Sequence, residues 1–416
     1  MQMDFQLSTL DSRLSTHNSR LLMNPWRGLG GLPREVWVLS AATFINRAGT
    51  MALPFLALYL MKQMGLGAAQ AGQGFVVYGL GAMVAAPLGG WLADRFGPLK
   101  VMRTSLLLSG QLMLGLPLVR DVRGFLLLIG AWALVSEGFR PASMSILADL
   151  APPELRKAVF SLNRLAINLG MSVGPALGGF IATRSYHGLF WVDGATTLAA
   201  WGVLALLVAG RPHQHEAGNG TALLSALRDP ALSYFLLAII PVVVVFFQHE
   251  GPMPIYLVRD LKLPESFYGS LFTLNTLMIV ALEVRLNLAT AHWPHRRALM
   301  LGSLLYAVGF GAMALAHTRA MIVATVVVWT FGEMVLFPAM SDYVASIAPP
   351  ARRGAYMGIY TFTFSVAFSF GPWLGTWMLD AWGGLVLWPW MGVLGLVSAL
   401  ALASIKTGSK APPSIP

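Results

Sequence analysis

Twelve apolar segments, each long enough to cross a bilayer, alternate with short polar turns along the chain. A transmembrane helix needs about 20 predominantly apolar residues. Segments of that length are expected near residues 36–61, 68–93, 100–119, 124–149, 158–183, 187–209, 231–257, 266–290, 297–316, 320–347, 354–379 and 384–405. The pattern therefore predicts an all-α integral membrane protein with twelve transmembrane helices.

One long polar stretch, residues 210–230, divides these segments into two sets of six. We expect an N-terminal tail over 1–35, a first six-helix bundle over 36–209 and a linker over 210–230. A second bundle over 231–405 and a tail over 406–416 complete the expected organisation.

The two sets of six are internal repeats. An offset of 197 residues (338 − 141) carries Pro141-Ala142 onto Pro338-Ala339 and Gly174-Pro175 onto Gly371-Pro372. The same offset carries Gly178 onto Gly375. A shared offset without gaps predicts two pseudo-symmetric bundles related by an axis along the membrane normal. In transporters built this way, the substrate site lies between the halves near the bilayer midplane.

The distribution of Lys and Arg orients the chain. If both termini are cytoplasmic, 17 of the 28 basic residues lie in inner segments, 7 in outer loops and 4 within spans. Cytoplasmic loops carry the excess of Lys and Arg. We therefore expect a multi-pass protein of the bacterial inner (plasma) membrane with both termini cytoplasmic.

Composition excludes several classes of protein. The chain is 56% hydrophobic and only 11% charged, against about 25% charged for a soluble domain. Its basic residues sit in short turns rather than in a patch, so no nucleic-acid partner is expected. There is no Cys, and hence no thiolate metal site. No nucleotide-binding loop, metal-ligand cluster or Asp-rich diphosphate motif indicates a membrane enzyme, and no metal or cofactor is expected.

The turn after the second segment carries a recognisable motif: Gly90, Asp94, Arg95, Gly97, Lys100 and Arg103. It resembles the loop signature of the major facilitator superfamily, although Pro98-Leu99 replaces two usually basic residues. The resemblance covers the whole chain and implies the major facilitator fold. It also implies that Asp94 and its basic neighbours latch cytoplasmic helix ends together, and Arg95 or Arg103 could reach Asp149 or Glu154.

A second motif, in the fifth segment, consists of Gly170, Gly174, Pro175, Gly178 and Gly179. It is similar to the fifth-helix motif of the proton-coupled drug-antiporter branch. Glycines permit close helix approach in lipid, so a plain packing seam is the alternative. The branch's usual fourth-helix Arg is replaced by Leu134, with Arg140 as a possible substitute.

In this architecture the first, fourth, seventh and tenth helices line the cavity, and each carries polar groups. A charge in mid-membrane costs on the order of 3 kcal/mol, so these groups are candidates for function as well as internal ion pairs. The proton-coupling candidates are Glu137, Arg140, Glu250, Glu283 and Glu333, with Glu137 expected to be the main proton-exchanging carboxyl. The substrate-cavity candidates are Asn46, Arg47, Arg164, Gln248, His249, Trp329, Phe337 and Tyr360.

The function expected from this resemblance is secondary active transport by alternating access. The first expectation is a monomeric proton-coupled antiporter that exports lipophilic or amphiphilic small molecules with the proton gradient as its energy source. The alternative is a carrier for another cargo, namely a siderophore, peptide, sugar or lysolipid, in efflux or uptake. A membrane enzyme or receptor is the third reading.

Overall fold

The computed structural model describes residues 31–150, 155–208, 227–290, 292–349 and 352–405. Most of the predicted N-terminal tail, most of the predicted linker and all of the predicted C-terminal tail therefore lie outside the described residues, and the first helix begins at Arg34, inside the predicted tail. Within the described ranges the regular secondary structure is entirely helical, in agreement with the predicted all-α membrane fold.

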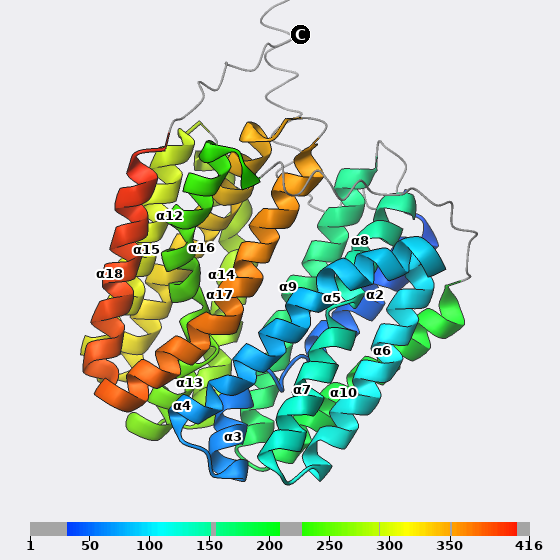
Figure 1. Ribbon diagram of the computed structural model, residues 1–416, viewed down its shortest axis with the longest axis horizontal. Coiled ribbons are helices and arrows are strands. Elements are labelled where there is room, and N and C mark those ends of the chain that lie inside the picture. The colour runs from blue at the N-terminus through cyan, green and yellow to red at the C-terminus, as the bar shows by residue number, and fades with distance from the viewer. Residues whose placement is uncertain (1–30, 151–154, 209–226, 291, 350–351, 406–416) are drawn as a thin grey trace, which may run out of the picture.

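The first half contains the helices α2 (Arg34–Gly49), α3 (Leu56–Met64), α4 (Ala68–Ala71), α5 (Gln73–Phe96), α6 (Pro98–Gly115), η1 (Leu116–Leu118), α7 (Val122–Ser136), α8 (Phe139–Leu150), α9 (Arg156–Ala182) and α10 (Tyr186–Leu207). The second half contains α12 (Pro230–Phe246), η2 (Phe247–His249), α13 (Pro252–Ile255), η3 (Tyr256–Asp260), α14 (Glu265–Thr290), α15 (His295–Gly311), η4 (Ala312–Leu315), α16 (Arg319–Ile347), α17 (Arg353–Trp382) and α18 (Gly384–Ala403). Figure 1 shows them as two bundles side by side.

Ten helical segments in the described ranges are long and apolar enough to cross a membrane. The two predicted spans that fall short have local reasons. The first is split into α2 and α3, and the eleventh, α17, is 30 residues long but rich in Gly, Ser, Thr and aromatic residues. Large apolar side chains such as Leu127, Leu206 and Leu385 are more than 70% exposed, as lipid-facing residues of a membrane protein are.

The start of α2 and the end of α18 lie at the same end of the molecule, which we call the proximal end (Figure 1). The opposite end, where α3, α4 and α13 lie, is the distal end. One buried apolar cluster runs from Met51 and Phe75 in the first half to Phe235 and Trp388 in the second, so the two halves share a core.

The first and seventh spans break at equivalent places. Helix α2 ends at Gly49 and α12 ends at Phe246, and the offset of 197 residues carries one end onto the other. Gly178 of α9 packs against Met51 and Phe55, and Gly375 of α17 packs against Gln248 and Pro252. The same offset relates each of these partners, so the predicted repeat is present in the packing itself.

The fourth span departs from prediction, because it breaks at Glu137 and Gly138 into α7 and α8. Pro141 has no N–H to bond the carbonyl of Glu137, and Gly has a low helix propensity. In the second half, Pro338 occupies the equivalent place, but Val335 replaces Gly138 and α16 is continuous. The break therefore follows from glycine rather than from proline alone.

Candidate substrate and proton site

The larger cavity between the halves has a volume of about 490 Å³. Its first-half wall comes from α5 and the break between α7 and α8, and its second-half wall from the end of α12, α16 and α17. The lining residues are Leu53, Tyr78, Ala82, Glu137, Arg140, Phe246, Phe247, Phe337, Ser341, Tyr360, Thr361, Phe364, Ser365 and Phe368. The cavity is thus formed by both halves, as the repeat predicts.

Glu137 is the acidic residue of this cavity. Because it lies where α7 ends, its side chain projects from a helix break rather than from a regular turn. The hydroxyl of Tyr78 donates a hydrogen bond of 2.7 Å to Glu137 Oε1. Arg140 lines the same cavity, but in the described residues no ion pair joins it to Glu137. Tyr78 was not singled out from the sequence, where it stands as one aromatic residue in an apolar span.

The wall opposite Glu137 is aromatic. The ring of Phe246 meets that of Phe337 edge-on at 4.9 Å, and Phe247 meets Phe368 at 5.1 Å. Tyr360 meets Phe364 at 5.1 Å. Such rings offer apolar area and a negative face to a cation.

A smaller cavity of about 220 Å³ lies on the other side of Phe246 and Phe247. Its lining includes the predicted residues His249, Glu250 and Glu333, and it reaches Asn168 of α9 in the first half. Glu333 Oε2 accepts a hydrogen bond of 2.9 Å from Asn275 of α14. Trp329 of α16 lies above the His249 ring, with centroids 6.1 Å apart.

His249 and Glu250 stand together at the break of the seventh span. His249 Nε2 lies 3.5 Å from Glu250 Oε1, and His249 Nδ1 is hydrogen-bonded to the carbonyl of Phe246. Both side chains are buried, and Glu250 Oε2 has no hydrogen-bond partner among the described residues.

Three other predicted cavity residues support the helix breaks instead and line neither cavity. Asn46 donates to Thr197 Oγ1 at 3.2 Å. Gln248 Nε2 donates to the carbonyls of Val244 and Gly371. Arg47 packs against Gly170, and its Nε is buried with no partner in the described part of the chain.

Glu283 and Arg164 form an ion pair across the halves, from α14 to α9. The sequence placed Glu283 beside Arg285 at a spacing that does not share a helix face, and its partner proves to be in the other bundle. Neither residue lines either cavity.

The residues of the loop signature lie at the proximal ends of α5 and α6. Gly97 has φ +89°, a conformation that favours glycine, whereas a Cβ on Gly90 would meet nothing within 4 Å. Arg103 donates to the carbonyls of Leu204, Ala205 and Val208 at the end of α10. The guanidinium of Arg95 stacks on Trp91 and Phe96.

Arg103 therefore holds the end of the sixth span, a role that the sequence did not indicate. Lys100 lies over the ring of Phe96, and Asp94 is exposed. Asp149 is the penultimate residue of α8, whereas Glu154 falls outside the described residues.

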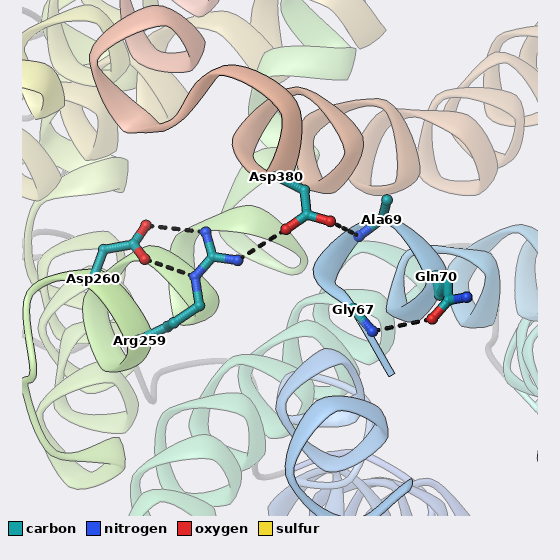
Figure 2. A network of polar contacts seen from close by, with 6 residues as sticks. All are labelled: Gly67, Ala69, Gln70, Arg259, Asp260 and Asp380. Atoms are coloured by element: carbon teal, nitrogen blue, oxygen red, sulfur yellow. Dashed lines mark hydrogen bonds and ion pairs between the residues drawn. The ribbon is translucent and has the colours of Figure 1, made fainter. Parts of the chain in front are cut away.

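A polar network, which we call the distal network, joins the halves at the distal end. Asp380 of α17 accepts hydrogen bonds from the backbone N–H of Ala69 and from Arg259, which also binds Asp260 (Figure 2). The distal network also includes Glu265 of the second half, which accepts hydrogen bonds from Lys62 and Tyr186 of the first half at 2.6 and 2.7 Å. The sequence counted Lys62 and Arg259 only as loop charges, yet they are related by the 197-residue offset.

Comparison with known proteins agrees with this fold. The family model described as Major Facilitator Superfamily matches residues 39–258 and 251–414. The chain is similar to an uncharacterized MFS-type transporter, YqjV, of Bacillus subtilis, with 26% identity over 87% of this chain and 89% of the relative. It is 22% identical to a Na⁺, Li⁺, K⁺/H⁺ antiporter of Planococcus maritimus, over 79% of this chain and 85% of the relative.

Multidrug resistance protein MdtH of Yersinia enterocolitica is 24% identical over 85% of this chain and 89% of its own length. Among solved structures, a variant of the nucleoside transporter NupG superposes with a TM-score of 0.79 at 12% identity, over 89% of this chain and 99% of that one. The peptide transporter POT in complex with sulfate gives 0.77 at 18% identity, over 91% and 95%. These structures share the fold, and the matched family consists of transporters rather than enzymes. The chain belongs to the Major Facilitator Superfamily.

Proposed function

We propose that this chain is a monomeric, proton-coupled antiporter of the bacterial inner membrane that exports lipophilic or amphiphilic small molecules, with both termini in the cytoplasm. The observation that carries the proposal is the larger cavity, in which one carboxyl group faces a wall of aromatic rings. Its volume of about 490 Å³ falls within the range of about 300–1,000 Å³ typical of small-molecule sites.

The chemistry of the lining favours a lipophilic cation. Glu137 supplies a negative charge, and Phe246, Phe337 and Phe364 supply apolar faces that attract a cation. The names of two relatives support the proposal at the level of family branch, because one is a multidrug resistance protein and another is a cation/H⁺ antiporter.

Alternating access is supported by where the halves touch. The distal network joins the two halves at one end. In addition, the hydroxyl of Tyr268 of α14 donates a hydrogen bond to the carbonyl of Pro54 in the first half. Rocking of the two bundles about the cavity requires these contacts to break while others form at the proximal end. Asp94 and its basic neighbours are proposed to make such proximal contacts in the alternate state.

Transport by reconstituted protein tests this function. Proteoliposomes that contain the purified chain should accumulate tetraphenylphosphonium in exchange for protons when a pH gradient is imposed, and dissipating the gradient should stop the uptake. Empty liposomes provide the control. Absence of gradient-driven flux of this and other lipophilic cations would refute the proposal.

Arg140 favours a second candidate cargo. An exposed guanidinium in the same cavity as Glu137 suits a substrate that carries an anionic group beside a cationic one, as a peptide or a lysolipid does. Competition against tetraphenylphosphonium binding by a dipeptide or by a lysophospholipid distinguishes these cargoes. Arg140→Gln should weaken whichever of these two competitors binds, because both carry an anionic group, and should leave the binding of tetraphenylphosphonium, which carries none, close to wild type.

A further inference from the structure

We propose that the proton and the substrate occupy different cavities: His249 and Glu250 hold one exchangeable proton in the smaller cavity, and the substrate lies beside Glu137 in the larger one, with Phe246 and Phe247 as the wall between them. This inference rests on the proposed function and deepens it. It also moves the proton from Glu137, where the sequence analysis put it, to the break in the seventh span.

The first step is hydrogen-bond chemistry. A carbonyl oxygen only accepts, so the nitrogen that faces Phe246 O, His249 Nδ1, must carry a proton. In a neutral imidazole the other nitrogen, Nε2, then has only a lone pair, and it faces Glu250 Oε1 at 3.5 Å. Two buried lone pairs facing each other are unfavourable, so one further proton belongs on either Nε2 or the carboxyl.

The second step concerns the surroundings of this pair. Glu250 Oε2 is buried without a hydrogen-bond partner in the part of the chain that the structure describes, so it is available to a water molecule that exchanges the proton. The other titratable groups around the pair are Glu333 of α16, whose Oε2 is held by Asn275, Tyr268 of α14, whose hydroxyl donates to the carbonyl of His249, and Tyr306 of α15. None of these neighbours supplies a second cation, so the proton is the positive charge of the smaller cavity within the described residues.

The third step is size. The smaller cavity measures about 220 Å³, which leaves room for several waters at roughly 30 Å³ each but is below the usual range for a drug-sized ligand. Phe246 and Phe247 line both cavities. Because His249 is hydrogen-bonded to the carbonyl of Phe246, the backbone of Phe246 contacts the proton site. Phe246 also lines the substrate cavity.

The internal repeat indicates that this pair is not part of the scaffold. The offset of 197 residues places Leu53 opposite Glu250 and Ala52 opposite His249, so the break of the first span forms without a His–Glu pair. There the backbone N–H groups of Met51 and Ala52 donate to Asp193 of α10 instead. The pair also lies where movement is expected, because its cavity is lined in part by Asn168 and Met171 of α9 from the other bundle.

A measurement that needs no substrate tests the proton site. Infrared difference spectra between acidic and alkaline pH should contain a band of the His249–Glu250 pair, from the carboxyl or from the imidazole, in the wild type and in Glu137→Gln. The band should disappear in Glu250→Gln and return in Glu250→Asp. Loss of the band in Glu137→Gln, with Glu250→Gln unaffected, would overturn the assignment even if the protein transports no lipophilic cation.

Binding of tetraphenylphosphonium tests the separation of the two sites. If one proton leaves per cation bound, the Kd of the wild type should fall by up to about tenfold per pH unit as the pH rises. Glu250→Gln should abolish this dependence and keep a Kd within about threefold, whereas Glu137→Gln should raise the Kd by about tenfold or more. Equal loss of affinity in both variants would contradict two separate sites.

The wall between the cavities has its own test. Phe247→Ala should let protons cross the proteoliposome membrane without substrate, because the two cavities then merge, while Phe364→Ala, which alters only the larger cavity, should not. Failure of the proposed function shows as absence of cation flux in the wild type. Failure of this inference shows as an infrared band that is lost in Glu137→Gln and kept in Glu250→Gln, or as a Phe247→Ala variant that does not leak protons.

Discussion

Gly174 of α9 lies against the backbone of Thr50, so closely that a Cβ on the glycine would stand 2.7 Å from the Thr50 carbonyl oxygen. Thr50 is the first residue after α2 ends. The glycine run therefore holds the break of the first span, and its last member, Gly179, packs against the start of α14 in the other half. The glycine run is thus a packing seam between α9, the break of the first span and the second half.

Gly174→Ala should consequently destabilise the protein. Overpacking of a close contact costs about 1–3 kcal/mol, and the contacted atom is backbone that cannot rotate away. Gly371→Ala is the matched control, because its Cβ would stand 3.4 Å from the carbonyl of Val244, whose first-half equivalent, the Arg47 carbonyl, would stand 3.0 Å from a Cβ on Gly174. Thermal unfolding in detergent should show a lower midpoint for Gly174→Ala than for Gly371→Ala. Equal midpoints would contradict the packing account.

Two adjacent glycines of α5 should respond differently to alanine. A Cβ on Gly89 would lie 2.8 Å from the Cα of Gly138 at the break beside Glu137, while one on Gly90 would meet nothing within 4 Å. Gly89→Ala should therefore push α5 from the break and slow transport, and Gly90→Ala should leave both stability and transport close to wild type. A Gly90→Ala defect as severe as that of Gly89→Ala would argue that the motif glycine acts in another conformation.

The distal network should set the balance between conformations. Glu265→Gln removes the charge that Lys62 binds across the halves, so the population with a separated distal end should rise. The chain has no Cys, and spin labels at Leu118→Cys and Leu385→Cys, two exposed positions near the distal end, would report longer distances. Asp260→Asn is the control, since Asp260 pairs with Arg259 of its own half. An unchanged distance distribution in Glu265→Gln would show that the network has no such role.

Asp94→Asn should act in the opposite sense. Asp94 is exposed in this conformation, in which the distal contacts are formed. Its proposed contacts belong to the alternate state, in which the proximal end is closed. Its removal should leave expression intact, slow transport and favour the conformation described. Transport rates in proteoliposomes measure the effect, and a wild-type rate would refute a latch at this loop.

Much of the architecture could be predicted because its causes are local. Apolar length predicted the spans, and the shared offset predicted equivalent packing, which the pairs Gly178–Met51 and Gly375–Gln248 display. The breaks of the first and seventh spans were not predicted, although Pro54 follows the first and Pro252 and Pro254 follow the second, because apolar length alone was used to set the spans. The break at Glu137 has a visible signal, Gly138 three residues before Pro141, that becomes decisive only by contrast with Val335.

The candidate site was predicted less completely, because its partners come from distant segments. Glu137, Glu250 and Glu333 were identified as intramembrane acids, but Tyr78 and Asn275, which bind two of them, carry no charge to mark them. Arg47 and Gln248 are likewise polar residues within apolar spans, yet in the structure they support helix breaks and line neither cavity. Only the three-dimensional arrangement separates two acidic cavities and places Phe246 and Phe247 between them.

Substrate-linked proton flux measured as a function of pH tests the central claim most directly. Wild-type proteoliposomes given tetraphenylphosphonium should exchange it for protons, Glu250→Gln should lose the exchange while still binding the cation, and Glu333→Gln should keep both. If Glu250→Gln retained a wild-type dependence of flux on pH while Glu137→Gln lost it, the proton would belong to the larger cavity, and the account of two separate sites would be wrong.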